Sequence, residues 1–297
     1  SWSALQAALA PWMQDQAPSD SSLIWIGWLD WLIGRSRKTP CIPLWPWRWA
    51  GAYYHLPPTF ASGGRGSPAW WKERLMPFWR FCAGEKCHGV AVLDEVWLAE
   101  TQRSLINRWL RPHRRKLFQL PDVASTHAAL SGRNTRRSEG RIRVGLFGQL
   151  SWRKGVLPFL RAARLAEQLN PQLEFLLGGE LQLHSFSDAD RQAIHELFGD
   201  PPSNLNYNPG AISNEAEFNA LVRQADVIHV AYHHFTGSSN LLTKAAHYRI
   251  PVIAYPGFLI GRRVLECSLG WLAAAETEQD YLDLVLSMHR TNLDRAQ

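Results

Sequence analysis

The stretch "RIRVGLFGQLSWRKGVLPFLRAA" at residues 141–163 joins an apolar run, a basic loop and a helix-like segment. The run at 141–148 is typical of a buried strand, and a helix is expected from about residue 156 to residue 169. "LEFLLGG" at 173–179 predicts a second strand. A strand, a crossover helix and a second strand predict a parallel βαβ unit.

The same alternation continues toward the C-terminus. Asn214 followed by Glu217 three residues later indicates a capped helix start, and an apolar stripe with helical spacing follows it. A helix is also expected at 188–198, and further strands are expected at 204–210, 226–232 and 250–256. This half of the chain is therefore predicted to form an α/β domain.

The length of 297 residues favours two domains, which we place at 1–135 and 136–297. The polar, Arg-rich stretch 125–141 is expected to link them. In the first half, strands are expected at 22–28, 90–99 and 116–122, helices at 68–81 and 101–110, and a loop at 61–68.

The formal charge of +6 and the pI near 9.3 favour anionic partners, which include nucleic acid, nucleotide phosphates and acidic membranes. Basic residues gather at 111–116 and 133–143, beside a Trp-rich first half. This pattern suits a peripheral contact with an anionic membrane surface, but solvated loops beside a Trp-rich core are the favoured explanation. The apolar run 22–34 contains Asp30 and is too short to span a bilayer.

The four Cys residues show no regular framework, and no secretory signal opens the chain, so a cytoplasmic location is expected. "CAGEKCH" at 82–88 has no second Cys/His pair, and we expect no metal site. The chain begins with Ser, which suggests that an N-terminal portion is missing.

Three loops follow predicted strands and precede helices, where ligands of parallel sheets bind. They span 148–155, 178–180 and 236–240. The first places Arg153 and Lys154 beside the start of a helix, an arrangement that suits a diphosphate, although two exposed loop cations are the plain alternative. The third is "TGSSN", in which a serine is expected to cap the helix. His229, His233 and His234 have no suitable partner for a metal and are expected to pack in the core and at its rim.

Several segments together resemble the glycosyltransferase family 4 group of GT-B glycosyltransferases. "VGLFGQLSWRKGVLPFLRAA" at 144–163 is similar to the family's strand, basic loop and helix, and "FLLGGE" is similar to its next strand. "TGSSNLLTKAAHYRIPVIA" at 236–254 is similar to its donor-site loop, helix and strand. "LDEVWLAETQRSLINRWLRPHRRKLFQLPDV" at 93–123 looks like the end of its N-terminal domain.

The resemblance implies an α/β fold of the GT-B type, with two Rossmann-like domains whose parallel sheets face a cleft. Arg153 and Lys154 would then be catalytic, because they neutralise the leaving diphosphate of a nucleotide-sugar donor, and no metal or other cofactor is expected. The implied substrate-binding residues are Gly148, Gly155, Gly179, Thr236, Gly237, Ser238, Ser239, Asn240 and Lys244.

The sequence departs from this family at two positions. The family carries two Glu residues that contact the donor sugar and the ribose, and the corresponding positions here are Thr236 and Lys244. Lys244 cannot accept a hydrogen bond from ribose, whereas Asn240, one turn earlier, can.

The leading hypothesis is therefore a glycosyltransferase that uses a nucleotide-diphosphate sugar. Its acceptor would be a cell-surface glycan, a lipid or a small molecule, and it would act in the cytoplasm or at the inner face of the membrane. The alternative is a non-catalytic protein of the same fold that binds nucleotide sugar or acts as a scaffold. Nucleic acid is not an expected partner, because no aromatic-interleaved binding motif accompanies the Arg residues.

Overall fold

The chain divides into two compact units, Ser1–Pro121 with Thr236–Ser238, and Asp122–Phe235 with Ser239–Gln297. The expected boundary between residues 135 and 136 lies outside the described residues. The computed structural model describes residues 23–27, 48–53, 87–93, 95, 98, 117–120, 122, 140–235 and 237–289.

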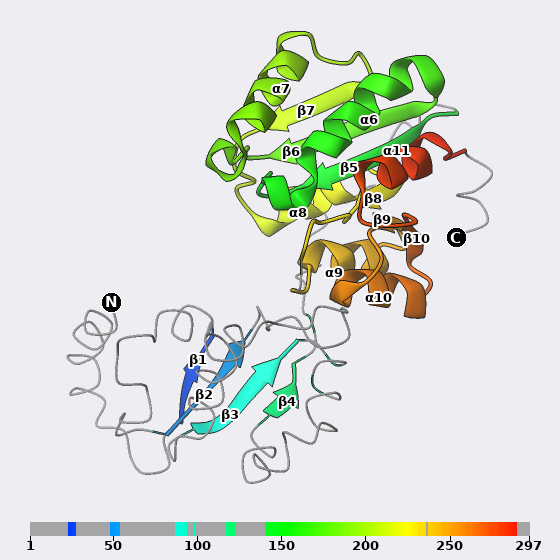
Figure 1. Cartoon of the computed structure of the whole chain (residues 1–297). Helices are drawn as coiled ribbons and strands as arrows, with labels where there is room; N and C mark the ends of the chain where they lie inside the picture. Colours follow the sequence, from blue (N-terminus) through cyan, green and yellow to red (C-terminus); the bar gives the residue numbers. More distant parts are fainter. Residues whose placement is uncertain are drawn as a thin grey trace, which may run out of the picture. The chain divides into compact units, whose positions relative to one another are not determined.

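The first unit contains a four-stranded parallel sheet (Figure 1). Its strand order is β1-β2-β3-β4, and every neighbouring pair runs parallel. The strands are β1 (Leu23–Ile26), β2 (Arg48–Tyr53), β3 (Cys87–Val92) and β4 (Leu117–Gln119).

Two details of this sheet differ from expectation. Strand β2 was not predicted, and the strand expected at 90–99 ends at Val92. Beyond Leu93, the two described residues Glu95 and Leu98 are helical, as their side chains prefer. The helices expected at 68–81 and 101–110 and the loop expected at 61–68 lie outside the described residues.

The second unit is built on a six-stranded parallel sheet with the order β10-β9-β8-β5-β6-β7. From β5 the chain proceeds outward through β6 and β7, then returns to the other side of β5 for β8, β9 and β10. Such a reversal creates a crevice at the carboxyl ends of the two central strands, here β5 and β8. The strands are β5 (Ile142–Phe147), β6 (Leu173–Gly179), β7 (Leu205–Pro209), β8 (Val227–His229), β9 (Val252–Ala254) and β10 (Gly270–Leu272).

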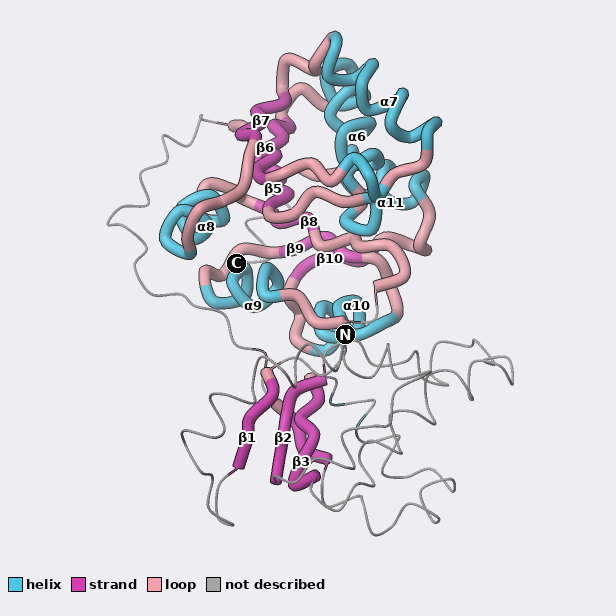
Figure 2. The backbone as a smooth tube through the Cα atoms, turned by 90° about the vertical axis from the view of Figure 1, so that its left-hand side faces the viewer, coloured by secondary structure: helices cyan, strands magenta, loops and turns pink. Residues whose placement is uncertain are grey.

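Helices cover both faces of this sheet (Figure 2). On one face lie α6 (Val156–Leu169), α7 (Asp188–Gly199) and α11 (Glu278–Leu286). On the other lie α8 (Glu215–Val222), α9 (Asn240–His247) and α10 (Phe258–Glu266), whose apolar residues share one core cluster. Two 3-10 turns, η6 (Trp152–Lys154) and η7 (Leu183–Ser185), follow β5 and β6. No helix in the described part of the chain is long and apolar enough to cross a bilayer.

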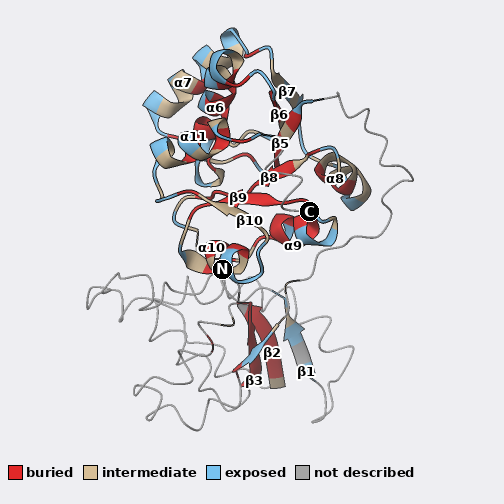
Figure 3. Cartoon of the chain, turned by 90° about the vertical axis from the view of Figure 1, so that its right-hand side faces the viewer, coloured by how far each residue is buried: buried red, intermediate tan, exposed pale blue. Residues whose placement is uncertain are grey.

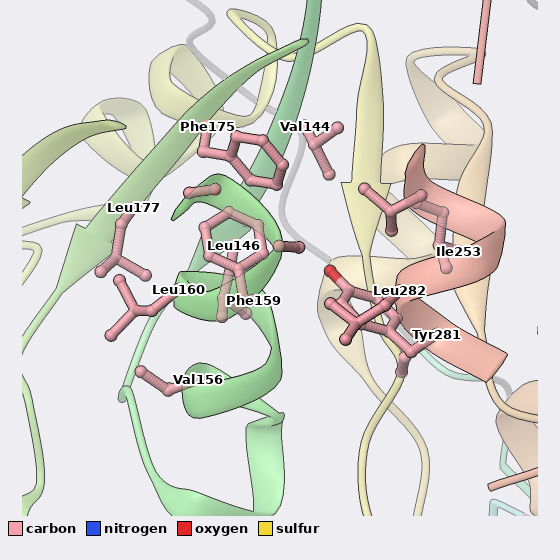
Figure 4. Packing of buried hydrophobic residues seen from close by; sticks show 14 of the residues in the cluster. Val144, Leu146, Val156, Phe159, Leu160, Phe175, Leu177, Ile253, Tyr281 and Leu282 are labelled. Carbon is pink, nitrogen blue, oxygen red and sulfur yellow. The ribbon is translucent and has the colours of Figure 1, made fainter. Parts of the chain in front are cut away.

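The core between β5, β6 and α6 holds the loop after β5 in place. Phe159 of α6 is fully buried and meets Phe175 of β6 edge to face, with ring centroids 5.2 Å apart. Tyr281 and Leu282 of α11 extend the same cluster (Figure 4). Buried residues concentrate on the central strands and on the inward sides of the helices (Figure 3). The start of α6 is therefore held in place by packing against the sheet and against α11.

Candidate functional site

The loop between β5 and α6 makes a tight turn at Gly155. This residue has φ 70°, in the left-handed region, and stands between η6 and α6. A Cβ here would lie 2.9 Å from the carbonyl oxygen of Ala231, so only glycine allows this close approach to the chain after β8. No side chain caps α6, which leaves its first backbone N–H groups without a side-chain acceptor.

The predicted cations Arg153 and Lys154 lie in this turn. Arg153 is exposed. The Lys154 ammonium donates to the carbonyl oxygen of Phe147 at 3.2 Å and stands 5.2 Å from the centre of the Tyr232 ring. Neither cation has a carboxylate partner among the residues that the structure describes. Two cations beside an open helix start can bind an anion such as a diphosphate.

The loops after β5 and β6 run together at two glycines. Gly179 has φ 135°, and a Cβ there would lie 1.8 Å from the carbonyl oxygen of Gly148. The Gly148 N–H donates to the carbonyl oxygen of Gly178 at 2.9 Å. A Cβ on Gly148 would lie 3.0 Å from the Lys154 ammonium, so the two predicted glycines and this cation are neighbours.

His229, at the end of β8, contacts the backbone of the turn that carries Arg153 and Lys154. It is fully buried, and its Nε2 lies 2.8 Å from the carbonyl oxygen of Lys154 while its Nδ1 lies 2.9 Å from the Tyr281 hydroxyl. A carbonyl only accepts, so Nε2 carries the proton and Nδ1 accepts from the hydroxyl. Burial lowers the pKa of His229 to about 3, and the ring is therefore neutral. This is the core role that the sequence indicated.

The rim of the turn is held by the residues that follow β8. The His233 N–H donates to the carbonyl oxygen of Arg153 at 2.7 Å, and the His233 ring stacks on Trp152 at 5.5 Å. Glu276 accepts from the His234 N–H at 2.6 Å. Burial lowers the pKa of His233, and nearby Glu276 opposes that effect. No group of three or more His, Cys, Asp or Glu side chains suited to a metal ion occurs in the described residues.

Tyr232 contacts both the start of α9 and Lys154 of the turn after β5. Ser239, one of the two serines expected to cap the helix, occupies the N-cap position, but its side chain makes no capping hydrogen bond. Its hydroxyl instead lies 3.4 Å from that of Tyr232, whose ring is the one beneath Lys154. Asn240 is the exposed first residue of α9. Thr236 lies outside the described residues, and the other predicted loop residues, Gly237 and Ser238, group with the first unit.

Lys244 is fully buried, although it carries an ammonium group. Its Nζ donates at 2.6 Å to Glu215 and at 2.6 Å to Asn219, both on α8. The same Nζ stands 5.2 Å from the centre of the Phe218 ring. This predicted substrate-binding residue therefore connects α9 to α8.

A pocket of about 480 Å³ opens at the carboxyl ends of β5, β6 and β7. Neither Asn240 nor Lys244 is among its lining residues, but Gly148 is. The carboxylates and the aromatic ring of this lining are not among the site residues predicted from the sequence. The rule that ligand sites follow parallel strands also covers the segment after β7 and would have pointed to it. The lining comprises Gly148, Gln149, Glu180, Ala211, Ile212, Ser213, Asn214, Glu215 and Phe218.

No protein-family model matches the sequence, and no curated protein matches it either. Solved structures do match. The chain is similar to a UDP-forming α,α-trehalose-phosphate synthase from Burkholderia xenovorans, with TM-score 0.64 and 11% identity over 99% of this chain and 72% of that one. It is also similar to sucrose-phosphate synthase from Thermosynechococcus elongatus, with TM-score 0.58 and 16% identity over 97% of this chain and 72% of that one.

A third similar structure is the catalytic domain of starch synthase IV from Arabidopsis thaliana bound to ADP and acarbose. Its TM-score is 0.59, with 13% identity over 98% of this chain and 70% of that one. At such identities the likeness establishes the fold alone. The predicted class is confirmed: the chain has the GT-B fold of these glycosyltransferases, with two Rossmann-like units built on parallel sheets. The cleft between the units stays a prediction.

Proposed function

We propose that this protein is a glycosyltransferase that binds a nucleotide-diphosphate sugar and transfers the sugar to an acceptor hydroxyl. The observation that carries the proposal is the pair Arg153 and Lys154, which have no carboxylate partner among the described residues and stand beside the uncapped start of α6. The similar structures support it, because one is a UDP-forming synthase and another is a starch synthase domain bound to ADP.

In the proposed reaction, the acceptor oxygen bonds to the anomeric carbon as the bond from that carbon to the diphosphate breaks. The leaving diphosphate takes the electron pair, and the hydroxyl proton passes to the diphosphate or to water. Arg153, Lys154 and the α6 N–H groups would stabilise the charge that develops on the diphosphate, which is commonly the largest catalytic contribution. The protein cations thus supply the charge that a divalent ion would otherwise bring.

The pocket beside Gly148 would hold the nucleoside. Its lining includes Glu180 and Glu215, which repel phosphate, whereas Lys154 lies next to Gly148 at one side of the pocket. The electrostatics therefore orient a nucleotide with its diphosphate toward Lys154 and its nucleoside inside the pocket. A glycan, a lipid or a small molecule is the proposed acceptor, in the cytoplasm or at the inner face of a membrane.

The proposal is tested by the thermal shift that UDP, ADP, GDP and CDP produce. A ligand at a hundredfold excess over its Kd adds ~2.7 kcal/mol to the unfolding free energy. Replacing Arg153 and Lys154 together with Ala should remove the shift, because each charge-assisted hydrogen bond contributes about 1.5–3 kcal/mol. Replacing Arg161 and Arg164 of α6 with Ala, which removes the same charge elsewhere, should leave the shift in place. Absence of any shift in the wild-type protein would contradict the proposal.

A second candidate is a non-catalytic protein that binds nucleotide sugar. It is favoured by the buried Lys244, which occupies a position where the resembling family has a carboxylate. Release of free sugar or nucleoside diphosphate from a bound nucleotide sugar separates the two candidates. Tight binding with no release, with or without sugar acceptors, would favour the non-catalytic protein.

A further inference from the structure

Lys244 places its charge against three side chains of α8, and two of them line the pocket. Its ammonium donates to Glu215 and Asn219, each at 2.6 Å, and stands 5.2 Å from the Phe218 ring. Glu215 and Phe218 are pocket residues, whereas Asn219 is fully buried behind them. A single buried cation therefore holds both an acidic and an aromatic group at the pocket wall.

The arrangement is asymmetric between the two ionic partners. The Lys244 side chain is 0% exposed, while that of Glu215 is 51% exposed. Burying a lysine ammonium is costly unless it is paired, and an apolar residue in its place would avoid that cost. The Glu215 carboxylate has two oxygens, and it can accept further hydrogen bonds besides the one that Lys244 donates. Glu215 thus keeps acceptor capacity toward the pocket while one oxygen is fixed.

The free acceptor capacity suits a group that donates hydrogen bonds and carries no negative charge. If a nucleotide lies as proposed above, with its diphosphate toward Lys154, the part inside the pocket is the nucleoside. Its ribose presents two neighbouring hydroxyl donors, which a fixed carboxylate can accept in a charge-assisted geometry. Phe218, on the same helix, offers an apolar surface to the remainder of the nucleoside.

We propose that Glu215 is the carboxylate that binds the ribose hydroxyls and that the buried Lys244 is the residue that positions it. The carboxylate thus comes from α8, and its counter-ion Lys244 comes from α9. This inference rests on the proposed nucleotide-binding function. It makes the pocket selective for ribonucleotides over deoxyribonucleotides.

The test compares the Kd of a nucleoside diphosphate with those of its 2′-deoxy and 3′-deoxy forms, using the base that gives the largest thermal shift. The quantity compared is the ratio of the Kd of a deoxy form to the Kd of the ribonucleotide. In the wild-type protein this ratio should be about ten or more. Replacing Glu215 with Ala and Lys244 with Met together avoids an unpaired buried charge and should bring the ratio close to one. Glu215→Gln keeps an acceptor for Lys244 and should lower the ratio. Lys244→Met alone keeps the carboxylate unanchored and should give an intermediate ratio.

Glu196→Gln, an exposed glutamate on α7, is the matched control and should keep the wild-type ratio. A wild-type ratio near one, or a double variant that keeps the wild-type ratio, overturns the inference while nucleotide binding stands. Loss of the ratio in Glu180→Gln but not in Glu215→Gln assigns the role to the other pocket carboxylate and also overturns it. A wild-type ratio in Lys244→Met refutes the positioning role. A wild-type protein that binds no nucleoside diphosphate overturns the proposed function together with this inference.

Discussion

Lowering the pH from 7 to 5 is expected to cost this protein about 2 kcal/mol of unfolding free energy through His229 alone. Burial lowers the pKa of this imidazole from 6.5 to about 3 in the folded protein. Between these values the unfolded chain binds a proton at His229 and the folded chain does not. Its contribution to stability is therefore complete above pH 6.5 and is lost as the pH falls toward 3.

The magnitude follows from the two pKa values. At pH 5 the unfolded imidazole is almost fully protonated, which favours the unfolded state by about 2 kcal/mol, against about 0.2 kcal/mol at pH 7. The folded ring is neutral at both values, so the loss depends little on how far below 4 its pKa lies. Protonating the ring in place would require the Tyr281 hydroxyl to turn and accept, and would place a charge in the core.

The assay is hydrogen exchange in urea at pH 7, 6 and 5, resolved to peptides of residues 140–289. His229→Gln is the comparison, because an amide can donate to the Lys154 carbonyl and accept from Tyr281 without titrating. The pKa of His233 is also lowered, and that group is present in both proteins. The wild-type protein should lose about 2 kcal/mol more than the variant between pH 7 and 5. Parallel losses in the two proteins would refute a neutral, buried His229.

Two substitutions test the packing that supports the site. In urea unfolding, Gly179→Ala should destabilise the second unit by more than ~2 kcal/mol, because its Cβ would lie 1.8 Å from the Gly148 carbonyl oxygen. The control is Gly199→Ala, because a Cβ at Gly199 would have open space around it. Phe159→Ala should cost ~3–5 kcal/mol in the same assay, while Leu169→Ala, whose side chain is 67% exposed, should cost far less.

Elements with a strong local pattern could be predicted from the sequence, and those defined by their neighbours could not. The helix expected at 156–169 and the strand expected at 173–179 have those bounds in the structure. Strand β2 reads "RWAGAY", where small residues give no apolar run, yet it is flanked by β1 and β3. Helix α10 contains Gly261, which weakens a helical pattern, and a Cβ there would meet the Tyr255 carbonyl oxygen at 2.3 Å.

The candidate site divides in the same way. The place of Arg153 and Lys154 beside the start of α6 could be predicted, because a loop between a parallel strand and a helix has a known place at the sheet edge. The pairing of Lys244 with Glu215 could not, because it joins residues 29 positions apart on two helices. Asn214 and Glu217 indicated where α8 begins, which the structure confirms, but a cap says nothing about which side chain of that helix faces a pocket.

Lys244 stands where the resembling family carries an acid, and the nearest acid in this structure comes from another helix. An unpaired lysine at this buried position would be strongly destabilising, so its presence requires an acid nearby, and Glu215 meets that requirement at 2.6 Å. The carboxylate therefore remains at the pocket wall although it comes from a different helix. Thr236, the second departure from the resembling family, lies outside the described residues. Ribose selectivity without release of sugar from a nucleotide sugar would favour the non-catalytic candidate.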